Sequence, residues 1–197
     1  RITNKKLGTR HLSDELRNII SDRDNIVKDE FDRAIEASTF IEIETEIDFI
    51  ELAERLATVL HRQLDDLKAS EIKELFIERE EESSTAISDF VAIPHIIIEG
   101  KSYFSIELVR AKKGIKFSQK HSSVKAVFVL IGSKDLRNLH LRALAAIAQI
   151  VHHPEFEQRW LEAKSHMDLK DLFLLGERRR TSGPEMITGE AELDDRV

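Results

Sequence analysis

The stretch Val91-Ala92-Ile93-Pro94-His95-Ile96-Ile97-Ile98 carries the strongest structural signal near the middle of the chain. Its apolar side chains form a run of the length of one strand. Pro94 has no N–H to contribute to a strand ladder, so it predicts an edge position or two short pieces around a bend. His95 then follows at an irregular point of the backbone, inside an otherwise apolar segment.

Further strands and helices are predicted on both sides of this stretch. Residues 40–44 and 103–109 alternate between apolar and polar side chains, which is the period of a half-buried strand. Residues 124–131 are almost continuously apolar and predict a buried strand, with turns expected at Gly100 and Gly114. Apolar side chains at helical spacing predict helices over residues 45–62, 70–80, 136–152, 156–163 and 168–175. This mixture predicts an α/β domain over residues 38–175.

The two ends of the chain differ from this central region. Residues 1–37 are rich in charge and carry apolar side chains at helical spacing, with Ser13 placed as an N-cap. They predict an N-terminal extension of one or two amphipathic helices packed on the main body. Residues 176–197 contain Arg178-Arg179-Arg180 and then Gly, Pro and acidic residues, which predicts a disordered tail. The chain opens with Arg1 rather than Met, as expected of a processed or excised piece of something longer.

Composition excludes several classes of function. The chain has 197 residues, of which 41% are hydrophobic and 34% charged, as in ordinary globular domains. It contains no cysteine, which excludes disulfides, thiolate metal sites and a cysteine nucleophile. The net charge of −7 argues against a nucleic-acid partner. No apolar run reaches the roughly 18–20 residues of a membrane span, and no signal peptide is evident.

Histidine is therefore the candidate nucleophile, and two of the eight histidines stand out. His95 lies in the apolar stretch after Pro94, and His140 lies in the first turn of a predicted helix, with Asn138 as a candidate cap. A histidine in either position is more often structural than functional. The other histidines have solvated or helix-closing contexts, and they are His11, His61, His121, His152, His153 and His166.

A set of residues in fixed order resembles a known family. The order is Arg79-Glu80, Ser84-Thr85-Ala86-Ile87, Val91 to His95, Gly114 to Phe117, Val124 to Leu130, and His140-Leu141 with Leu144. This series resembles the enzyme IIA components of the fructose, mannitol and nitrogen-regulatory branches of the bacterial phosphoenolpyruvate-dependent phosphotransferase system. The resemblance covers residues 38–175 and implies the mannitol-type enzyme IIA fold, a mixed β-sheet flanked by helices.

The resemblance also implies roles for five residues. His95 corresponds to the phosphoryl acceptor of the family, and His140 to its second histidine. Arg79 corresponds to the family arginine, Thr85 to its hydroxyl residue, and Ser84 lies beside it. These residue types suit phosphoryl transfer, which depends on positioning and on stabilising charge at the transferred oxygens. Without the resemblance, Arg79 would be read as a salt bridge to a neighbouring glutamate, and Ser84 and Thr85 as capping residues.

One departure from the family leaves two functions open. Members commonly carry glycines where this chain has Ser88-Asp89-Phe90, so docking of the usual partner is in question. The first function is a phosphoryl carrier that takes a phosphoryl group on His95 from the phosphorylated histidine-containing phosphocarrier protein. The second is a cytoplasmic regulatory domain of a membrane transporter that keeps the enzyme IIA fold.

The implied partners follow from these two functions. They are the phosphocarrier protein, enzyme IIB or a transporter membrane domain, and a second copy of the chain in a homodimer. The implied location is cytoplasmic, free or tethered to a membrane transporter. No cofactor is expected. Zinc on His95 and His140 is disfavoured, because two histidines without a carboxylate motif fall short of the ligands that zinc needs.

Overall fold

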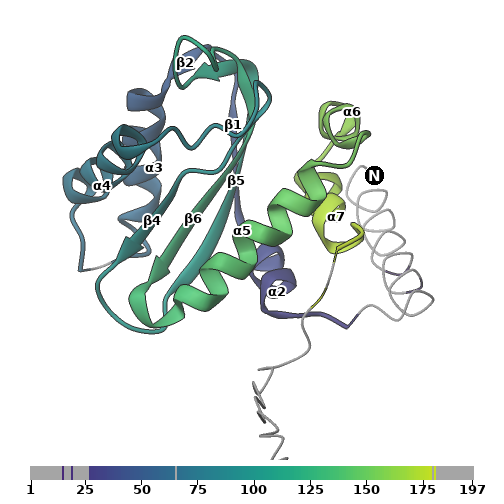
Figure 1. Ribbon diagram of the computed structural model, residues 1–197, viewed down its shortest axis with the longest axis horizontal. Helices are drawn as coiled ribbons and strands as arrows, with labels where there is room; N and C mark the ends of the chain where they lie inside the picture. Colours follow the sequence, from purple (N-terminus) through teal and green to yellow (C-terminus); the bar gives the residue numbers. More distant parts are fainter. Residues whose placement is uncertain (1–14, 16–18, 20–26, 65, 179, 181–197) are drawn as a thin grey trace, which may run out of the picture. The chain divides into compact units, whose positions relative to one another are not determined.

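A single mixed β-sheet forms the centre of the protein in the computed structural model (Figure 1), which describes residues 15, 19, 27–64, 66–178 and 180. The strands are β1 (Thr39–Ile43), β2 (Ile47–Asp48), β3 (Val91–Ala92), β4 (His95–Ile98), β5 (Phe104–Lys116) and β6 (Val124–Ser133). The helices are α2 (Glu30–Ala37), α3 (Phe49–Leu60), α4 (Ala69–Glu82), α5 (Arg137–Val151), α6 (Phe156–Glu162) and α7 (His166–Leu174). These elements confirm the predicted α/β class with a mixed sheet flanked by helices.

The sheet has the order β1, β5, β6 and then β3 with β4. β5 and β6 pair antiparallel, whereas β1 and β2 run parallel to β5, and β3 and β4 run parallel to β6. The apolar stretch around Pro94 therefore forms two short strands at one edge of the sheet, as its proline predicted. The carbonyl of Pro94 still accepts a hydrogen bond from the Leu130 N–H at 2.9 Å, so the break between the two strands is small.

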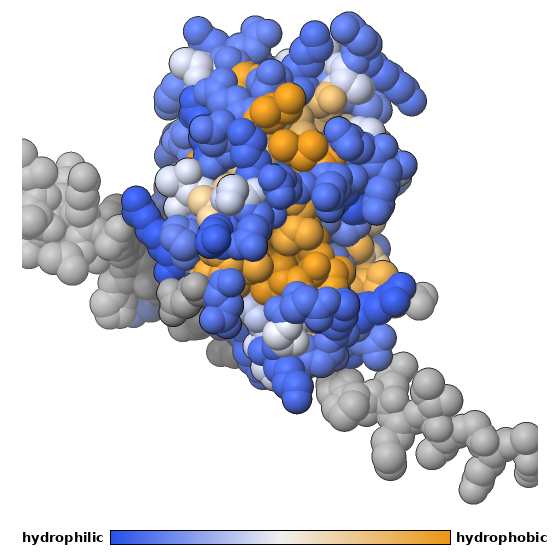
Figure 2. All heavy atoms as spheres, turned by 90° about the vertical axis from the view of Figure 1, so that its left-hand side faces the viewer, coloured by the Kyte–Doolittle hydropathy of each residue, from blue (hydrophilic) through white to orange (hydrophobic). Residues whose placement is uncertain are grey.

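Helices cover both faces of the sheet, with α3 and α4 on one side and α2, α5, α6 and α7 on the other (Figure 1). A hydrophobic core lies on each face of the sheet, and the side chains of β6 alternate between the two cores. Val127, Val129 and Ile131 enter the core on the α3–α4 side. Ala126, Phe128 and Leu130 enter the other core. β6 is thus buried on both faces, which explains its continuous apolar sequence. The α3–α4 face is mostly hydrophilic, with a band of hydrophobic side chains across its middle (Figure 2).

Three local predictions were wrong. Gly114 does not end a strand: with φ of +93° it lies inside β5, where the register to β6 shifts between Arg110 and Ile115. Glycine suits this irregularity because other residues rarely adopt positive φ. The helix predicted from residue 45 begins at Phe49, since residues 47–48 form β2 and Asp48 caps the helix. Asn138 is not a cap, because a short 3-10 turn, Lys134–Leu136, leads directly into α5.

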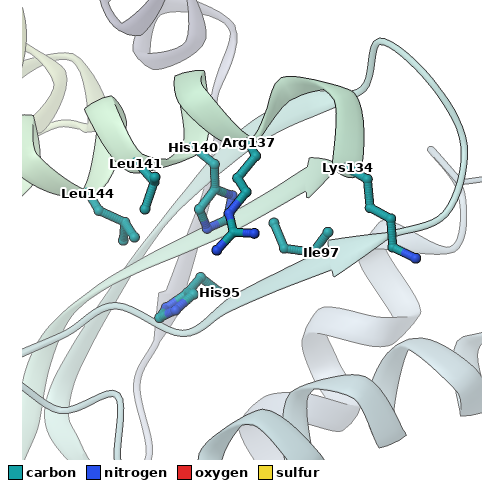
Figure 3. Close-up of a pocket in the computed structure, with 7 residues that line it drawn as sticks. All are labelled: His95, Ile97, Lys134, Arg137, His140, Leu141 and Leu144. Carbon is teal, nitrogen blue, oxygen red and sulfur yellow. The ribbon is translucent and has the colours of Figure 1, made fainter.

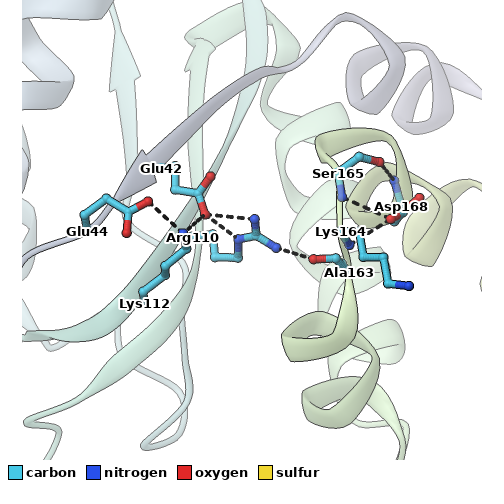
Figure 4. A network of polar contacts seen from close by, with 8 residues as sticks. All are labelled: Glu42, Glu44, Arg110, Lys112, Ala163, Lys164, Ser165 and Asp168. Atoms are coloured by element: carbon cyan, nitrogen blue, oxygen red, sulfur yellow. Dashed lines mark hydrogen bonds and ion pairs between the residues drawn. The ribbon is translucent and has the colours of Figure 1, made fainter. Parts of the chain in front are cut away.

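A polar network joins the edge of the sheet to the last two helices (Figure 4). Arg110 on β5 lies opposite Glu42 on β1 and contacts its Oε1 at 2.8 Å. The same guanidinium donates to the carbonyl of Ala163 at 2.7 Å, just after α6. Lys112 extends the network along β5 to Glu44, at 2.7 Å. Arg110 therefore fixes the link between α6 and α7 against the sheet.

The folded unit runs from Glu30 to Arg178. Its ends meet in an ion pair between Asp32 and Arg178, 2.7 Å apart, with both side chains 1% exposed. The Arg178 guanidinium also lies 4.6 Å from the centre of the Phe31 ring. The capping site predicted at Ser13 and nearly all of the predicted tail lie outside the described residues. Within the part of the chain that the structure describes, no helix is long and apolar enough to cross a membrane.

Candidate functional site

His95 is the first residue of β4, and the backbone around it fixes the protonation of its ring. Its Nδ1 lies 2.8 Å from the carbonyl oxygen of Ile93. A carbonyl oxygen accepts but cannot donate, so Nδ1 carries the proton in this contact. Nε2 is then unprotonated and accepts a hydrogen bond from Arg79 Nε at 3.2 Å. The structure thus presents Nε2 as the nucleophilic nitrogen.

The pKa of His95 is lowered from its ordinary value of 6.5, first by burial and further by the charge of Arg79. The hydrogen bond to Ile93 opposes this shift in part. A lowered pKa keeps the ring neutral, and a neutral ring keeps its lone pair available. His95 therefore presents an unprotonated Nε2 at neutral pH, as a nucleophilic role would require.

Arg79 lies in the last turn of α4 and connects this helix to His95. Its Nη1 donates to the carbonyl of Ser83 at 2.9 Å, while its Nε contacts the histidine ring. Among the described residues, no glutamate forms an ion pair with Arg79, so the salt-bridge reading does not hold. A cation at the C-terminus of a helix is favoured by the helix dipole. The guanidinium is thereby positioned beside the nucleophilic nitrogen.

His140 lies against His95, although 45 residues separate the two in the sequence. The ring centroids are 5.5 Å apart with the planes inclined at 60°. His140 is only 3% exposed, and neither of its ring nitrogens has a hydrogen-bond partner in the structure. Burial, and then the positive charge that His95 carries when it is protonated, lowers its pKa to about 4. His140 is therefore neutral at pH 7, with both ring nitrogens unpaired.

Glycine at position 132 makes room for this second ring. A Cβ on Gly132 would lie 2.9 Å from Nδ1 of His140 and 3.4 Å from the ring of Phe104. Phe104 also packs against His140 with a centroid distance of 6.1 Å and the rings nearly perpendicular. The strand β6 thus forms the wall against which the buried histidine rests.

The predicted hydroxyl residues contact Glu80 rather than the histidines. Ser84 donates its hydroxyl to Glu80 Oε1 at 2.7 Å, and Thr85 donates its backbone N–H and hydroxyl to Oε2 at 2.8 and 2.5 Å. The Thr85 carbonyl in turn accepts the N–H of Ile93 at 2.9 Å, two residues before the nucleophile. Neither residue caps α4, whose C-cap is Ser83, although Ser84 accepts the backbone N–H of Ala86 at 3.3 Å in a local turn. Through Glu80 both residues hold the segment that precedes His95.

A pocket of about 520 Å³ opens beside the two histidines (Figure 3). Its lining joins β4 to the start of α5 and consists of His95, Ile97, Lys134, Arg137, His140, Leu141 and Leu144. Arg79, Ser84 and Thr85 are not part of this lining. Sequence reasoning missed Arg137, which lies three residues before His140. That spacing places two side chains on the same face of a helix and could have indicated it.

The chemistry of the site does not suggest a metal. Within the residues described by the structure, no group of three or more potential ligands comes together. The arrangement instead joins one neutral nucleophilic imidazole, a second buried imidazole and an arginine. Such a set can accept a tetrahedral anion such as a phosphoryl group.

Solved structures with the same architecture identify the class of fold. The nitrogen regulatory protein IIA-Ntr from Neisseria meningitidis matches with a TM-score of 0.62 and 20% identity, covering 70% of this chain and 93% of the other. Enzyme IIA-mannitol from Escherichia coli, solved in complex with phosphorylated enzyme IIB-mannitol, matches with a TM-score of 0.55 and 12% identity, covering 71% and 95%. The protein therefore has the mannitol-type enzyme IIA fold.

Sequence comparison then gives the family. Residues 37–174 match the family described as phosphoenolpyruvate-dependent sugar phosphotransferase system, EIIA 2. The chain belongs to this family, as the resemblance predicted.

Two relatives from Bacillus subtilis support this assignment. The mannitol-specific phosphotransferase enzyme IIA component is 36% identical over 99 residues, which are 49% of this chain and 66% of the relative. The fructose-specific EIIABC component of the phosphotransferase system is 30% identical over 122 residues, 60% of this chain and 19% of the relative. The chain thus spans just under two thirds of the first relative and about a fifth of the second.

Proposed function

We propose that the chain carries a phosphoryl group on Nε2 of His95. The observation that carries this proposal is the pair of contacts on the His95 ring, with Nδ1 on the carbonyl of Ile93 and Nε2 facing Arg79. In the reaction, the lone pair of Nε2 forms a bond to phosphorus, and the bond from phosphorus to the donor nitrogen breaks, leaving its electron pair on the donor. No proton has to leave His95, because Nε2 carries none.

Arg79 and His140 have distinct roles in this proposal. Arg79 moves its hydrogen bond from Nε2 to the phosphoryl oxygens, where a planar guanidinium can donate more than one bond. His140 offers a ring N–H to the same oxygens, which gives its unpaired nitrogens a partner. Thr85 and Ser84 position the segment before His95 through Glu80, and to bind the phosphoryl oxygens their O–H groups turn from Glu80 to donate to those oxygens.

The proposed donor is the phosphorylated histidine-containing phosphocarrier protein, and the proposed acceptor is enzyme IIB or a transporter membrane domain. One structural relative was solved with phosphorylated enzyme IIB-mannitol, and one sequence relative is named as an EIIABC component. Exposed apolar side chains beside the pocket suit a protein partner, because Ile97 is 38% and Leu141 53% exposed. These partners place the chain in the cytoplasm.

A phosphorylation assay tests the proposal. The chain is incubated with labelled phosphoenolpyruvate, enzyme I and the phosphocarrier protein. We expect one acid-labile phosphoryl group per chain, no label on His95→Ala, and unchanged labelling on the control His152→Ala, whose ring contacts the carbonyl of Ala148 at the far end of α5. No acid-labile label on the wild type, or equal label on His95→Ala, would contradict the proposal.

The segment Ser88-Asp89-Phe90 favours the second candidate, a cytoplasmic regulatory domain of a membrane transporter. Its side chains are engaged: Ser88 accepts backbone N–H groups, Asp89 contacts His121 at 2.9 Å, and Phe90 is buried. Side-chain contacts thus fix this segment at positions where the family commonly has glycine. When enzyme IIB is added to this assay, label on His95 that is not passed on to enzyme IIB would favour the regulatory function.

A further inference from the structure

A phosphoryl group at this site requires more positive charge than the residues named so far supply. A phosphohistidine is close to a dianion at neutral pH. Arg79 provides one positive charge beside Nε2 of His95. His140 is neutral in the free chain, since burial holds its pKa at about 4. One charge of the phosphoryl group is therefore left without a cation among the residues that the family resemblance indicated.

The pocket contains two further cations, and they differ in what holds them. Lys134 forms an ion pair with Glu99, and its side chain points away from the histidines (Figure 3). Arg137 is exposed, and its guanidinium forms no hydrogen bond or ion pair with any described residue, whereas its backbone N–H donates to the carbonyl of Lys134. Its guanidinium points down from the start of α5 into the pocket, on the side of His140 and above His95 (Figure 3).

Within the described part of the chain, Arg33, Arg62 and Arg159 also lack a side-chain partner, but Arg137 is the arginine that lines this pocket, and other arginines of the fold are paired. Arg55, Arg110, Arg142 and Arg178 each contact a carboxylate in the structure, at 2.6 to 2.9 Å. Arg137 also begins a helix, where the dipole favours an anion rather than a cation. A cation placed against the dipole and left unpaired is costly unless an anion joins it. The unpaired nitrogens of buried His140 point to the same ligand.

We propose that Arg137 binds the oxygens of the phosphoryl group on His95, on the opposite side from Arg79. The two guanidinium groups then enclose the phosphoryl group from α4 and from α5, with the ring of His140 between them. This inference rests on the proposed function, because it assigns a further binding residue to the same phosphoryl site. If Arg137 has this role, the start of α5 contributes to the binding of the phosphoryl group.

The ionisation of the phosphoryl group provides the test. The wild type, His95→Ala, Arg137→Gln and Arg137→Lys are phosphorylated with potassium phosphoramidate, which requires no protein donor. The second pKa of the phosphoryl group is then read from the ³¹P chemical shift as a function of pH. Because a cation within about 4–6 Å lowers such a pKa by about one unit or more, Arg137→Gln should raise the midpoint by about one pH unit.

A matched control lies on the same helix. Arg142→Gln removes a guanidinium that contacts Glu30 at 2.9 Å and does not line the pocket, so its midpoint should equal that of the wild type. Arg137→Lys keeps the charge and should titrate closer to the wild type than Arg137→Gln does. A purely structural role of Arg137 would not move the midpoint.

The outcomes separate the two proposals. No phosphohistidine signal on the wild type, or the same signal on His95→Ala, would overturn the proposed function and the role of Arg137 with it. A signal that depends on His95 but titrates identically in the wild type and Arg137→Gln would overturn the role of Arg137 alone. Equal midpoints for Arg137→Lys and Arg137→Gln would also overturn it, because charge would then have no effect.

Discussion

The buried neutral state of His140 predicts a specific pH dependence of stability. The pKa of this ring is about 4 in the folded protein, against 6.5 for an ordinary histidine. Between these two values the unfolded chain binds a proton that the folded protein does not bind. Unfolding is therefore favoured as the pH falls from 6.5 toward 4, and the contribution of His140 to stability is complete only above pH 6.5.

The size of the effect follows from the same two values. Each pH unit of difference corresponds to about 1.36 kcal/mol, so lowering the pH from 7.5 to 4.5 should remove about 2.5 kcal/mol of stability through His140. His140→Gln keeps a polar side chain but cannot titrate in this range. Between pH 7.5 and 4.5 its free energy of unfolding should therefore fall by about 2.5 kcal/mol less than that of the wild type.

Urea unfolding followed by the fluorescence of Trp160 measures this difference. Trp160 is the only tryptophan of the sequence and is fully buried, so its emission reports the loss of the core. The wild type and His140→Gln both contain His95, so the difference between their losses of stability gives the contribution of His140. Equal losses of stability in the two chains would refute the reasoning, as would an NMR titration of the His140 ring with a midpoint near 6.5.

The remaining predictions concern the site and the ends of the fold. Arg79→Gln removes the donor beside the nucleophilic nitrogen and should slow phosphoryl acceptance about 100-fold in the labelling assay, with urea stability nearly unchanged. Gly132→Ala places a Cβ 2.9 Å from the ring of His140 and should lower the free energy of unfolding by about 1–3 kcal/mol, measured by urea titration. Asp32→Asn leaves the guanidinium of Arg178 buried without its carboxylate and should cost about 3–5 kcal/mol, seen as a lower melting temperature.

Each of these three predictions has a result that contradicts it. Labelling of Arg79→Gln within twofold of the wild type would show that the arginine does not assist transfer. If Gly132→Ala is as stable as the wild type, then β6 or the His140 ring can shift to accommodate the added methyl group without cost. For Asp32→Asn the control is Glu30→Gln in the exposed pair with Arg142, which should change stability by no more than about 1 kcal/mol. A loss for Asp32→Asn no larger than this control would contradict the prediction.

Local pattern determined much of the fold. The alternation of β1, the apolar run of β6 and the helical spacing of α3 each depend on neighbours in the sequence, and each element formed close to its predicted range. Pro94 predicted the break between β3 and β4 because a missing N–H acts at the residue itself. The turn expected at Gly114 failed because pairing with β6 absorbs the irregularity as a shift in register within β5.

The sequence by itself determined most of the elements and, through the resemblance, predicted roles for His95, His140 and Arg79. Only the tertiary structure decided their chemistry. The parallel pairing of β4 with β6 and the start of α5 bring His95 and His140 to 5.5 Å, and the burial that results makes the second ring neutral. In the same packing, Ser84 and Thr85 hydrogen-bond to Glu80, and Arg137 lines the pocket. Burial and distance depend on residues far apart in the chain, so no local pattern could determine them.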